Sequence, residues 1–316
     1  MERFEGRLAV VTGGGSGIGR ELVRQLAQAG AHVATCDIDL ERARETVALA
    51  EKEAPGVRLT AHACDVSVED DVLRFRNEVL AQHETDHVHL LFNNAGVGGG
   101  GSFINDDRAT WERTFGICWG GVYLGCRAFL PHLIAADEAV VINTSSVNGF
   151  WASLGPGIPH TAYSTAKFAV KGFTEALMED LRVNAPHVRA AVVMPGHIGT
   201  DIVNNSRKVH AGSATVDADT IAAAREEMAK QGLPVDSMDD AAVASMIEGM
   251  GDMFRDTAPT SAAEAAAIIL DGVRAGRWRI LVGEDAIALD ERVRADPERA
   301  YEPDSDGLST ISLPRA

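Results

Sequence analysis

The sequence predicts an α/β protein in which one parallel sheet is covered by helices on both faces. Seven short apolar runs of strand length recur along the chain, and segments with helical patterning separate them. The runs are apolar at successive positions instead of alternating, as is typical of strands that are buried on both faces. With 316 residues, of which 46% are hydrophobic, the chain is long enough to build a large core without cross-links.

The expected strands and helices alternate through the first two thirds of the chain. The expected strands are residues 8–12, 32–37, 58–65, 89–93, 139–145, 188–195 and 279–282. Helical patterns cover 40–53, 67–83 and a long run that includes Tyr163. Residues 201–256 are polar and rich in Ala and Met, without a strand pattern, so we expect a helical excursion there before a helix at about 260–275.

These elements indicate one domain over residues 1–283, followed by a C-terminal extension over 284–316 that is charged and contains several prolines. The excursion at 201–256 has two interpretations. Its methionines can pack a small core, or they can form an adaptable lid over an apolar substrate, because methionine fills irregular spaces.

Composition argues against several classes of partner. The chain has 29 basic and 46 acidic residues, a net charge of −17, whereas phosphate-rich partners such as nucleic acids or anionic membranes need clustered Lys and Arg. No apolar run approaches the roughly 18 residues of a membrane-spanning helix, and the N-terminus lacks a secretory pattern. The four cysteines are scattered, which predicts buried reduced thiols, a cytoplasmic location and no metal site.

A glycine-rich loop joins the first expected strand to the first expected helix. Its residues are Gly13, Gly14, Gly15, Ser16, Gly17, Ile18 and Gly19. Glycines let the backbone turn sharply and approach a ligand, and the free N–H groups of a helix N-terminus suit a diphosphate. The alternative is a tight strand-to-helix turn without a ligand. The position of the loop inside a β-α-β unit favours dinucleotide binding.

Asp37 ends the second expected strand, 18 residues after Gly19. A carboxylate there can accept hydrogen bonds from both adenosine-ribose hydroxyls and would repel a 2′-phosphate. No Arg follows Gly13, Gly14 or Asp37 directly, so the sequence favours NAD over NADP. The alternative role for Asp37 is to cap the next helix, which Asp39 would do equally well.

Two further motifs follow the third and fourth strands. Asp65 and Val66 come after the third strand, where a contact with the adenine and the start of a helix are equally plausible interpretations. The run Asn93-Asn94-Ala95-Gly96 ends the fourth strand. Ligands of such sheets bind at the carboxyl ends of the strands, where all these motifs are expected to lie.

Tyr163 and Lys167 are one helical turn apart, so their side chains share one face of the helix. A nearby cation lowers the pKa of a phenol, which normally holds its proton to about pH 10. Such a phenol can give a proton to a carbonyl or take one from an alcohol. Ser146, after the fifth strand, can donate a hydrogen bond to the developing alkoxide. A Tyr-x-x-x-Lys pair alone is common on helix surfaces and gains meaning only with the glycine loop.

Together these motifs resemble the short-chain dehydrogenase/reductase family, in its compact branch. The matching motifs, in the order of that family, are Thr12 to Gly19, Asn93 to Gly96, Ser146, Tyr163 with Lys167, and Pro195-Gly196 with Ile198 and Thr200. The resemblance covers residues 5 to about 200. It implies a single Rossmann-type, doubly wound domain and reversible NAD(P)-dependent alcohol and ketone chemistry on a small molecule, in a homodimer or homotetramer.

The resemblance also implies roles for individual residues. Tyr163 would be the general acid and base, Lys167 would lower its pKa and bind the nicotinamide ribose, and Ser146 would orient the substrate. Ile198 and Thr200 would contact the nicotinamide end of the cofactor. We therefore expect an NAD-dependent enzyme that oxidises a secondary alcohol or reduces a ketone on a medium-sized, mostly apolar substrate.

The sequence departs from the family pattern most clearly at Cys118, where members often have an Asn that helps to hold a water in a proton relay to the lysine. A thiol is a weak hydrogen-bonding group, although a backbone carbonyl could hold the water instead. This departure supports an alternative, a dinucleotide-binding regulatory or scaffold protein with little catalysis, against which the intact Ser146, Tyr163 and Lys167 argue. An epimerase or dehydratase of the longer branch would need a larger C-terminal domain than this chain has.

Overall fold

Seven parallel strands form the central sheet of the protein. The structure is a computed structural model and describes residues 1–155, 158–211, 216, 218–230, 235 and 238–302. The strands of the sheet are β1 (Leu8–Thr12), β2 (His32–Asp37), β3 (Leu59–Ala63), β4 (Leu90–Asn93), β5 (Ala139–Thr144), β6 (Val188–Pro195) and β9 (Arg279–Val282). Their order across the sheet is β3-β2-β1-β4-β5-β6-β9, and every pair is parallel. The chain steps from β3 across β1 to β4, which creates the switch point where such sheets bind ligands.

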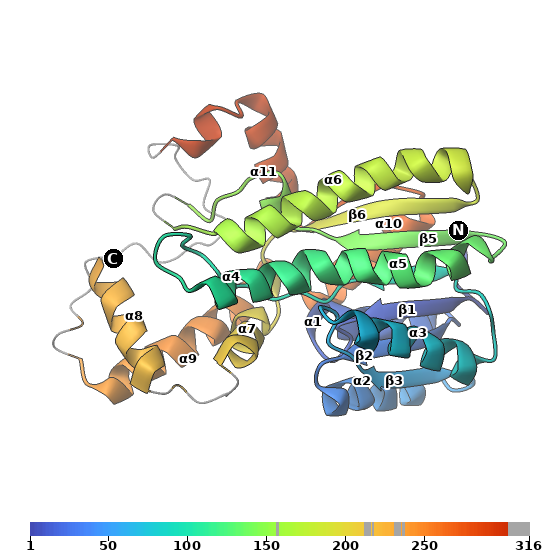
Figure 1. Cartoon of the computed structure of the whole chain (residues 1–316), viewed down its shortest axis with the longest axis horizontal. Coiled ribbons are helices and arrows are strands. Elements are labelled where there is room, and N and C mark those ends of the chain that lie inside the picture. Colours follow the sequence, from blue (N-terminus) through green and yellow to red (C-terminus); the bar gives the residue numbers. More distant parts are fainter. Residues whose placement is uncertain (156–157, 212–215, 217, 231–234, 236–237, 303–316) are drawn as a thin grey trace.

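Helices cover both faces of this sheet (Figure 1). One face packs against α1 (Gly17–Gln28), α2 (Leu40–Glu53) and α10 (Ala262–Arg274). The other packs against α3 (Glu69–His83), α5 (Gly121–Ile134) and α6 (Thr161–Asn184). A further helix, α4 (Arg108–Phe115), continues through a π-helical turn at Gly116–Gly120 into α5. All five residues of β1 are buried, because helices shield both sides of it. The predicted doubly wound α/β fold is confirmed.

The excursion between β6 and α10 is helical, as predicted. It contains α7 (Ile202–Ala211), α8 (Ala218–Lys230) and α9 (Asp240–Asp256), and it is closed by the short parallel pair β7 (Ile198–Gly199) and β8 (Thr260–Ser261). A small separate core of Met228, Val235, Val243 and Ile247 holds α8 and α9 together. Met246 and Met250 are exposed, so core packing explains only part of the methionine content. Residues 212–215, 217, 231–234 and 236–237 of the expected lid lie outside the described residues.

The C-terminal extension begins as part of the folded body. Helix α11 (Glu284–Ala295) and a 3₁₀ turn at Arg299–Tyr301 pack on the loop that follows β5. There the indole of Trp151, which is 1% exposed, donates to the carbonyl of Ala300 at 2.9 Å. The loop between Ser146 and Tyr163 is therefore held at Trp151 by the extension. Residues 303–316 lie outside the described part of the chain.

Membrane-spanning helices and clusters of metal-binding side chains are both absent from the described residues. No described helix is both long enough and apolar enough to cross a membrane. Within the same residues, no group of three or more His, Cys, Asp or Glu side chains is placed to hold a metal ion.

Candidate active site

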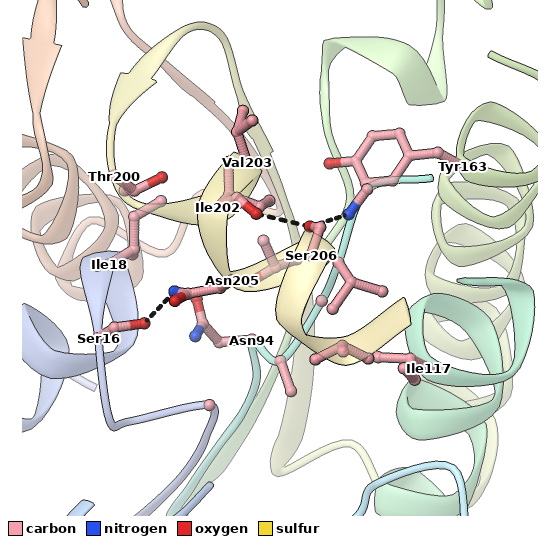
Figure 2. A pocket seen from close by; sticks show the side chains of 18 of the residues that line it. Ser16, Ile18, Asn94, Ile117, Tyr163, Thr200, Ile202, Val203, Asn205 and Ser206 are labelled. Carbon is pink, nitrogen blue, oxygen red and sulfur yellow. Dashed lines mark hydrogen bonds between the residues drawn. The ribbon is translucent and has the colours of Figure 1, made fainter. Parts of the chain in front are cut away.

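A cavity of about 710 Å³ opens at the carboxyl ends of the strands, between the glycine-rich loop and the helices α6 and α7 (Figure 2). It is lined by every residue that the sequence predicted for catalysis or cofactor binding, with the exception of Asn93. Residues from six separate motifs therefore meet around one hollow, although they are spread over nearly 190 positions of the chain.

Asn93 is not among the residues that line this cavity. Its side chain is 2% exposed, and its amide donates to Asn143 Oδ1 at 2.8 Å and to the sulfur of Cys126. The next residue, Asn94, lines the cavity instead and donates through Nδ2 to the carbonyl of Thr12 at 3.0 Å. The side chain of Asn94 thus faces the cavity while that of Asn93 is bonded within the protein, and the role of Asn93 in cofactor binding stays a prediction.

The glycine-rich loop leaves room for a ligand because side chains are missing from it. Gly17 has φ of +52°, a left-handed conformation that favours glycine, and it starts α1. A Cβ on Gly19 would lie 2.0 Å from the carbonyl oxygen of Gly13, so any other residue would push the loop apart. The side chain of Ser16, the N-cap, makes no hydrogen bond to the first helical turn, which leaves N–H groups there for an anion.

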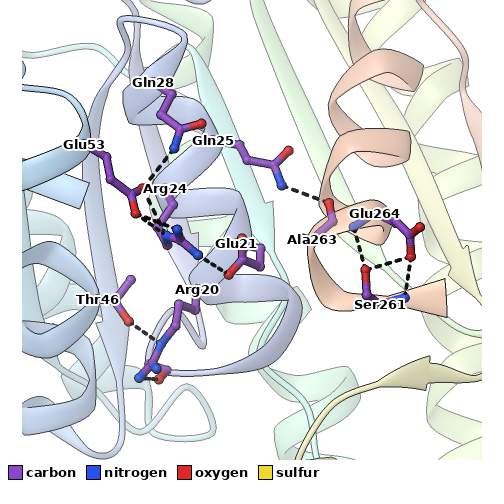
Figure 3. Close-up of polar contacts among 11 residues, drawn as sticks. Arg20, Glu21, Arg24, Gln25, Gln28, Thr46, Glu53, Ser261, Ala263 and Glu264 are labelled. Atoms are coloured by element: carbon purple, nitrogen blue, oxygen red, sulfur yellow. Dashed lines mark hydrogen bonds and ion pairs between the residues drawn. The ribbon is translucent and has the colours of Figure 1, made fainter. Parts of the chain in front are cut away.

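The orientation of α1 is fixed on both of its sides (Figure 3). Arg24 pairs with Glu53 of α2 at 2.5 Å, and Gln28 donates to the same carboxylate. On the opposite side, Gln25 donates to the carbonyl of Ala263 at the start of α10. The start of α10 is itself fixed by a capping box between Ser261 and Glu264. These contacts hold the N-terminus of α1 toward the cavity.

Asp37 stands beside the glycine loop at the end of β2. Its Oδ2 accepts from the N–H of Gly15 at 2.9 Å, and its Oδ1 accepts from the N–H of Asp39 at 3.0 Å. The side chain of Asp39, and not that of Asp37, caps α2 by accepting from the N–H of Arg42. The alternative role for Asp37 as a helix cap is therefore excluded, and its carboxylate lines the cavity with acceptor positions to spare.

Asp65, Val66 and Ala95 line the cavity beyond Asp37. The Oδ1 of Asp65 accepts from the N–H and the hydroxyl of Ser67, while Val68 is the N-cap of α3. The hydroxyl of Thr12 accepts from the N–H of Ala95 at 3.1 Å and so ties β1 to the loop after β4.

Ser146, Tyr163 and Lys167 converge on one wall of the cavity. The hydroxyl of Ser146 lies close enough to the phenol of Tyr163 to lower its pKa. The ammonium of Lys167, 2% exposed, lies 5.3 Å from the ring centre of Tyr163 and donates to the carbonyl of Thr144 at 2.9 Å. The neighbouring Ser145 is buried, and its hydroxyl donates to the carbonyl of Lys167. Both serines line the cavity, but the proton of Ser145 is used in that bond, so Ser146 is the serine whose hydroxyl proton can reach a ligand.

The pKa of Tyr163 is raised above its ordinary value of about 10, contrary to the sequence-based expectation. Burial of the phenol is the largest cause, and the nearby Cys118 adds to it. The ammonium of Lys167 and the hydrogen bond with Ser146 act in the expected direction, but they do not outweigh burial. Spacing along a helix reveals the neighbouring cation, whereas the desolvation of the phenol depends on the whole fold.

The loop after β6 forms the side of the cavity next to Tyr163. Ile198 is buried, and both Ile198 and Thr200 line the cavity. The N–H of His197 donates to Asp285 Oδ2 at 2.7 Å, so the first turn of α11 fixes this loop. The ring of His197 is bonded to the carbonyl of Phe254 at 2.7 Å. The C-terminal extension thus supports the segment that carries Ile198 and Thr200.

Helix α7 closes the outer side of the cavity and supplies contacts that sequence reasoning missed. Asn205 donates to the hydroxyl of Ser16 at 3.2 Å and accepts from Arg42 at 2.7 Å (Figure 2). Ser206 accepts from the N–H of Gly98 at 2.7 Å. Residues 201–256 carry no motif that we could assign, so nothing in the sequence distinguished Asn205 and Ser206. Arg42 could have been found, because the Asp39 cap places it on the first turn of α2.

Cys118 is fully buried in the π-helical turn, and its thiol donates to the carbonyl of Val97 at 3.1 Å. We expect Cys118→Ser to keep kcat within about threefold of wild type, because a hydroxyl can make the same bond and is not required to move a proton. Steady-state kinetics with thermal unfolding as a folding control will check this. Loss of more than about 100-fold in kcat from a folded variant would place the thiol in the proton path.

Comparisons with known proteins agree on one family. Its model, described as short chain dehydrogenase, matches residues 7–211. SadH of Mycobacterium tuberculosis is 34% identical over 294 residues, which cover 93% of this chain and 92% of SadH. A solved short chain dehydrogenase/reductase from Burkholderia phymatum in complex with NAD is 26% identical, with a TM-score of 0.77, and the match covers 99% of this chain and 100% of that one. A metagenomic short-chain oxidoreductase in complex with NADP is 27% identical, with a TM-score of 0.54, over 82% of this chain and 96% of that one.

Proposed function

The chain belongs to the short-chain dehydrogenase family, and from this premise we propose that it is an NAD-dependent enzyme that oxidises a secondary alcohol and reduces the corresponding ketone. The observation that carries the proposal is the convergence of Ser146, Tyr163 and Lys167 at the end of a glycine-lined cavity. The substrate is expected to be a medium-sized, mostly apolar small molecule, because apolar side chains of Val97, Leu154, Ile202 and Phe254 line the rest of the cavity.

The residues present fit a nicotinamide dinucleotide. The glycine loop leaves backbone N–H groups and open space at the start of α1, where a Cβ on Gly15 would lie 2.7 Å from Asp37 Oδ2. Asp37 would accept from the adenosine-ribose hydroxyls, and its charge disfavours a phosphate at that position. Lys167 would bind the nicotinamide ribose, with Ile198 and Thr200 beside the nicotinamide. The bound cofactor supplies the ring carbon that gives or takes a hydride.

The protein itself would move the proton and hold the reacting oxygen. In alcohol oxidation, Tyr163 takes the hydroxyl proton while Ser146 donates a hydrogen bond to the same oxygen. In ketone reduction, the phenol returns its proton to the carbonyl oxygen. The ammonium of Lys167 favours the phenolate and so partly offsets the cost of burying it.

This chemistry predicts that the rates of the two directions depend differently on pH. Because burial raises the pKa of Tyr163, its base form is scarce near neutrality, so kcat/KM for alcohol oxidation should rise roughly tenfold per pH unit toward alkaline pH. Reduction needs the protonated phenol and should stay level over the same range. Initial rates in both directions across the pH range test this. An oxidation rate that does not change with pH would contradict the role of Tyr163 as the base.

The activity can be tested by measuring NADH formation with a series of secondary alcohols. Turnover with any member supports an enzyme. Binding of NADH without turnover of any alcohol or ketone in the series would favour the alternative, a dinucleotide-binding regulatory or scaffold protein.

We also propose a cytoplasmic homodimer or homotetramer. All four cysteines are free and buried, which suits a reducing compartment. Large apolar side chains are exposed on α5 and α6, including Tyr123 at 44% and Phe168 at 41%, and a second copy of the chain could cover them. Light scattering of the purified protein measures the oligomeric state directly.

A further inference from the structure

His160 lies directly against the phenol that the proposed chemistry uses. It immediately precedes α6, three residues before Tyr163. The two rings pack with their centres 4.7 Å apart and their planes tilted by 41°. The side chain of His160 lines the same cavity as Ser146, Asn148 and Tyr163. Any molecule whose oxygen reaches Tyr163 therefore passes beside this imidazole.

The imidazole of His160 has no hydrogen-bond partner among the described residues. It sits at the N-cap position of α6 but makes no capping bond, and the residue is part of the cavity wall. The other two cavity histidines differ in this respect. His197 is bonded to the carbonyl of Phe254 and His210 to the carbonyl of Gly98. His160 alone of the three keeps both nitrogens available to a bound molecule.

The ring of His160 is uncharged at neutral pH. Burial lowers its pKa to about 4, so at pH 7 it carries one N–H donor and one bare nitrogen acceptor. A neutral imidazole suits a hydroxyl or a carbonyl oxygen as its partner. It gives no particular advantage to a carboxylate or a phosphate, which would favour a cation.

We propose that His160 binds a second oxygen of the substrate, and that the natural substrates are alcohols or ketones with a hydroxyl or carbonyl group on a neighbouring carbon. The assignment rests on the proposed alcohol and ketone chemistry, in which Ser146 and Tyr163 hold the first oxygen. Contact between the rings of His160 and Tyr163 places the two binding positions side by side, as the two oxygens of a vicinal diol or an α-hydroxyketone are. The apolar remainder of the cavity, with Val97, Leu154 and Phe254, would take the hydrocarbon part.

The test compares cyclohexanol with its vicinal diol as substrates of the wild type and of two variants. His160→Phe keeps an aromatic ring against Tyr163 and removes both nitrogens. It should lower kcat/KM for the diol by about tenfold or more while leaving cyclohexanol within about twofold of wild type. His160→Asn retains a donor and an acceptor and should recover part of the preference for the diol. NADH affinity and the unfolding temperature serve as controls for the fold.

The outcomes separate this inference from the function on which it rests. If the wild type oxidises neither these two compounds nor any other secondary alcohol, the proposed function fails. If the wild type turns over both compounds and His160→Phe lowers both equally or neither, the function stands and the role of His160 is wrong. If His160→Phe does not fold, His160→Leu takes its place, because it too removes both nitrogens. The proposal is overturned if that variant keeps the wild-type ratio of the two kcat/KM values, or if the wild type shows no preference for the diol.

Discussion

Tyr163→Phe is expected to lower kcat by a factor of roughly 100 to 10,000, because it removes the phenol that is proposed to exchange a proton with the substrate oxygen. The ring is retained, so its packing against His160 should survive. NADH binding should stay within about twofold of wild type, since the phenolic oxygen is assigned to the substrate. Turnover is measured under saturating NAD, and NADH affinity by fluorescence titration.

The chain offers a matched control for this variant. Tyr123 is 44% exposed on α5, away from the cavity-lining residues, and Tyr123→Phe removes a phenolic oxygen without touching the site. Its activity should equal that of the wild type. If Tyr163→Phe keeps more than about a tenth of wild-type turnover, the phenol is not the acid and base, and another group must move the proton.

NAD is expected to be preferred over NADP by roughly 100-fold in kcat/KM, because the Asp37 carboxylate would face the added phosphate across a short distance. Asp37→Asn removes the charge and keeps an oxygen that can accept from the N–H of Gly15. This variant should lose most of the discrimination, chiefly through better use of NADP. Arg42 also lines the cavity. Once the charge of Asp37 is removed, the guanidinium of Arg42 can pair with the 2′-phosphate of NADP without a competing carboxylate.

A double variant identifies the contribution of Arg42. Adding Arg42→Gln to Asp37→Asn should reduce the gain with NADP and affect NAD much less. Wild-type kinetics with NADP that equal or exceed those with NAD would refute the assignment of Asp37. The same wild-type preference in Asp37→Asn would show that another part of the cavity selects the cofactor.

Much of the fold follows from local pattern. Seven apolar runs became the seven strands of the main sheet, because a strand shielded by helices on both faces must be apolar throughout. The pattern could not show that the C-terminal extension packs on the loop around Trp151, since the bond from Trp151 to Ala300 joins residues 149 positions apart. A charged segment that contains prolines predicts an extended C-terminal arm. Only the structure, in which one face of α11 is buried, shows where this segment packs.

The candidate site was predictable where a motif determines backbone geometry. The glycine loop, Asp37 and the pair Tyr163 and Lys167 belong to such motifs, and they line one cavity. Asn205 and His160 were missed because their positions depend on the path of α7 and on a loop of irregular structure. The direction of the pKa shift of Tyr163 was wrong for a related reason, since burial is a property of the assembled fold.

The central claim is spatial, and a crystal structure of the protein with bound NAD tests it most directly. The account predicts the diphosphate on the N–H groups at the start of α1, the adenosine ribose on Asp37, and the nicotinamide ring beside Tyr163 and Lys167, with Ser146 facing the same open space. NAD bound outside this cavity would contradict the account, as would a nicotinamide ring that lies beyond the reach of an oxygen held by Ser146 and Tyr163.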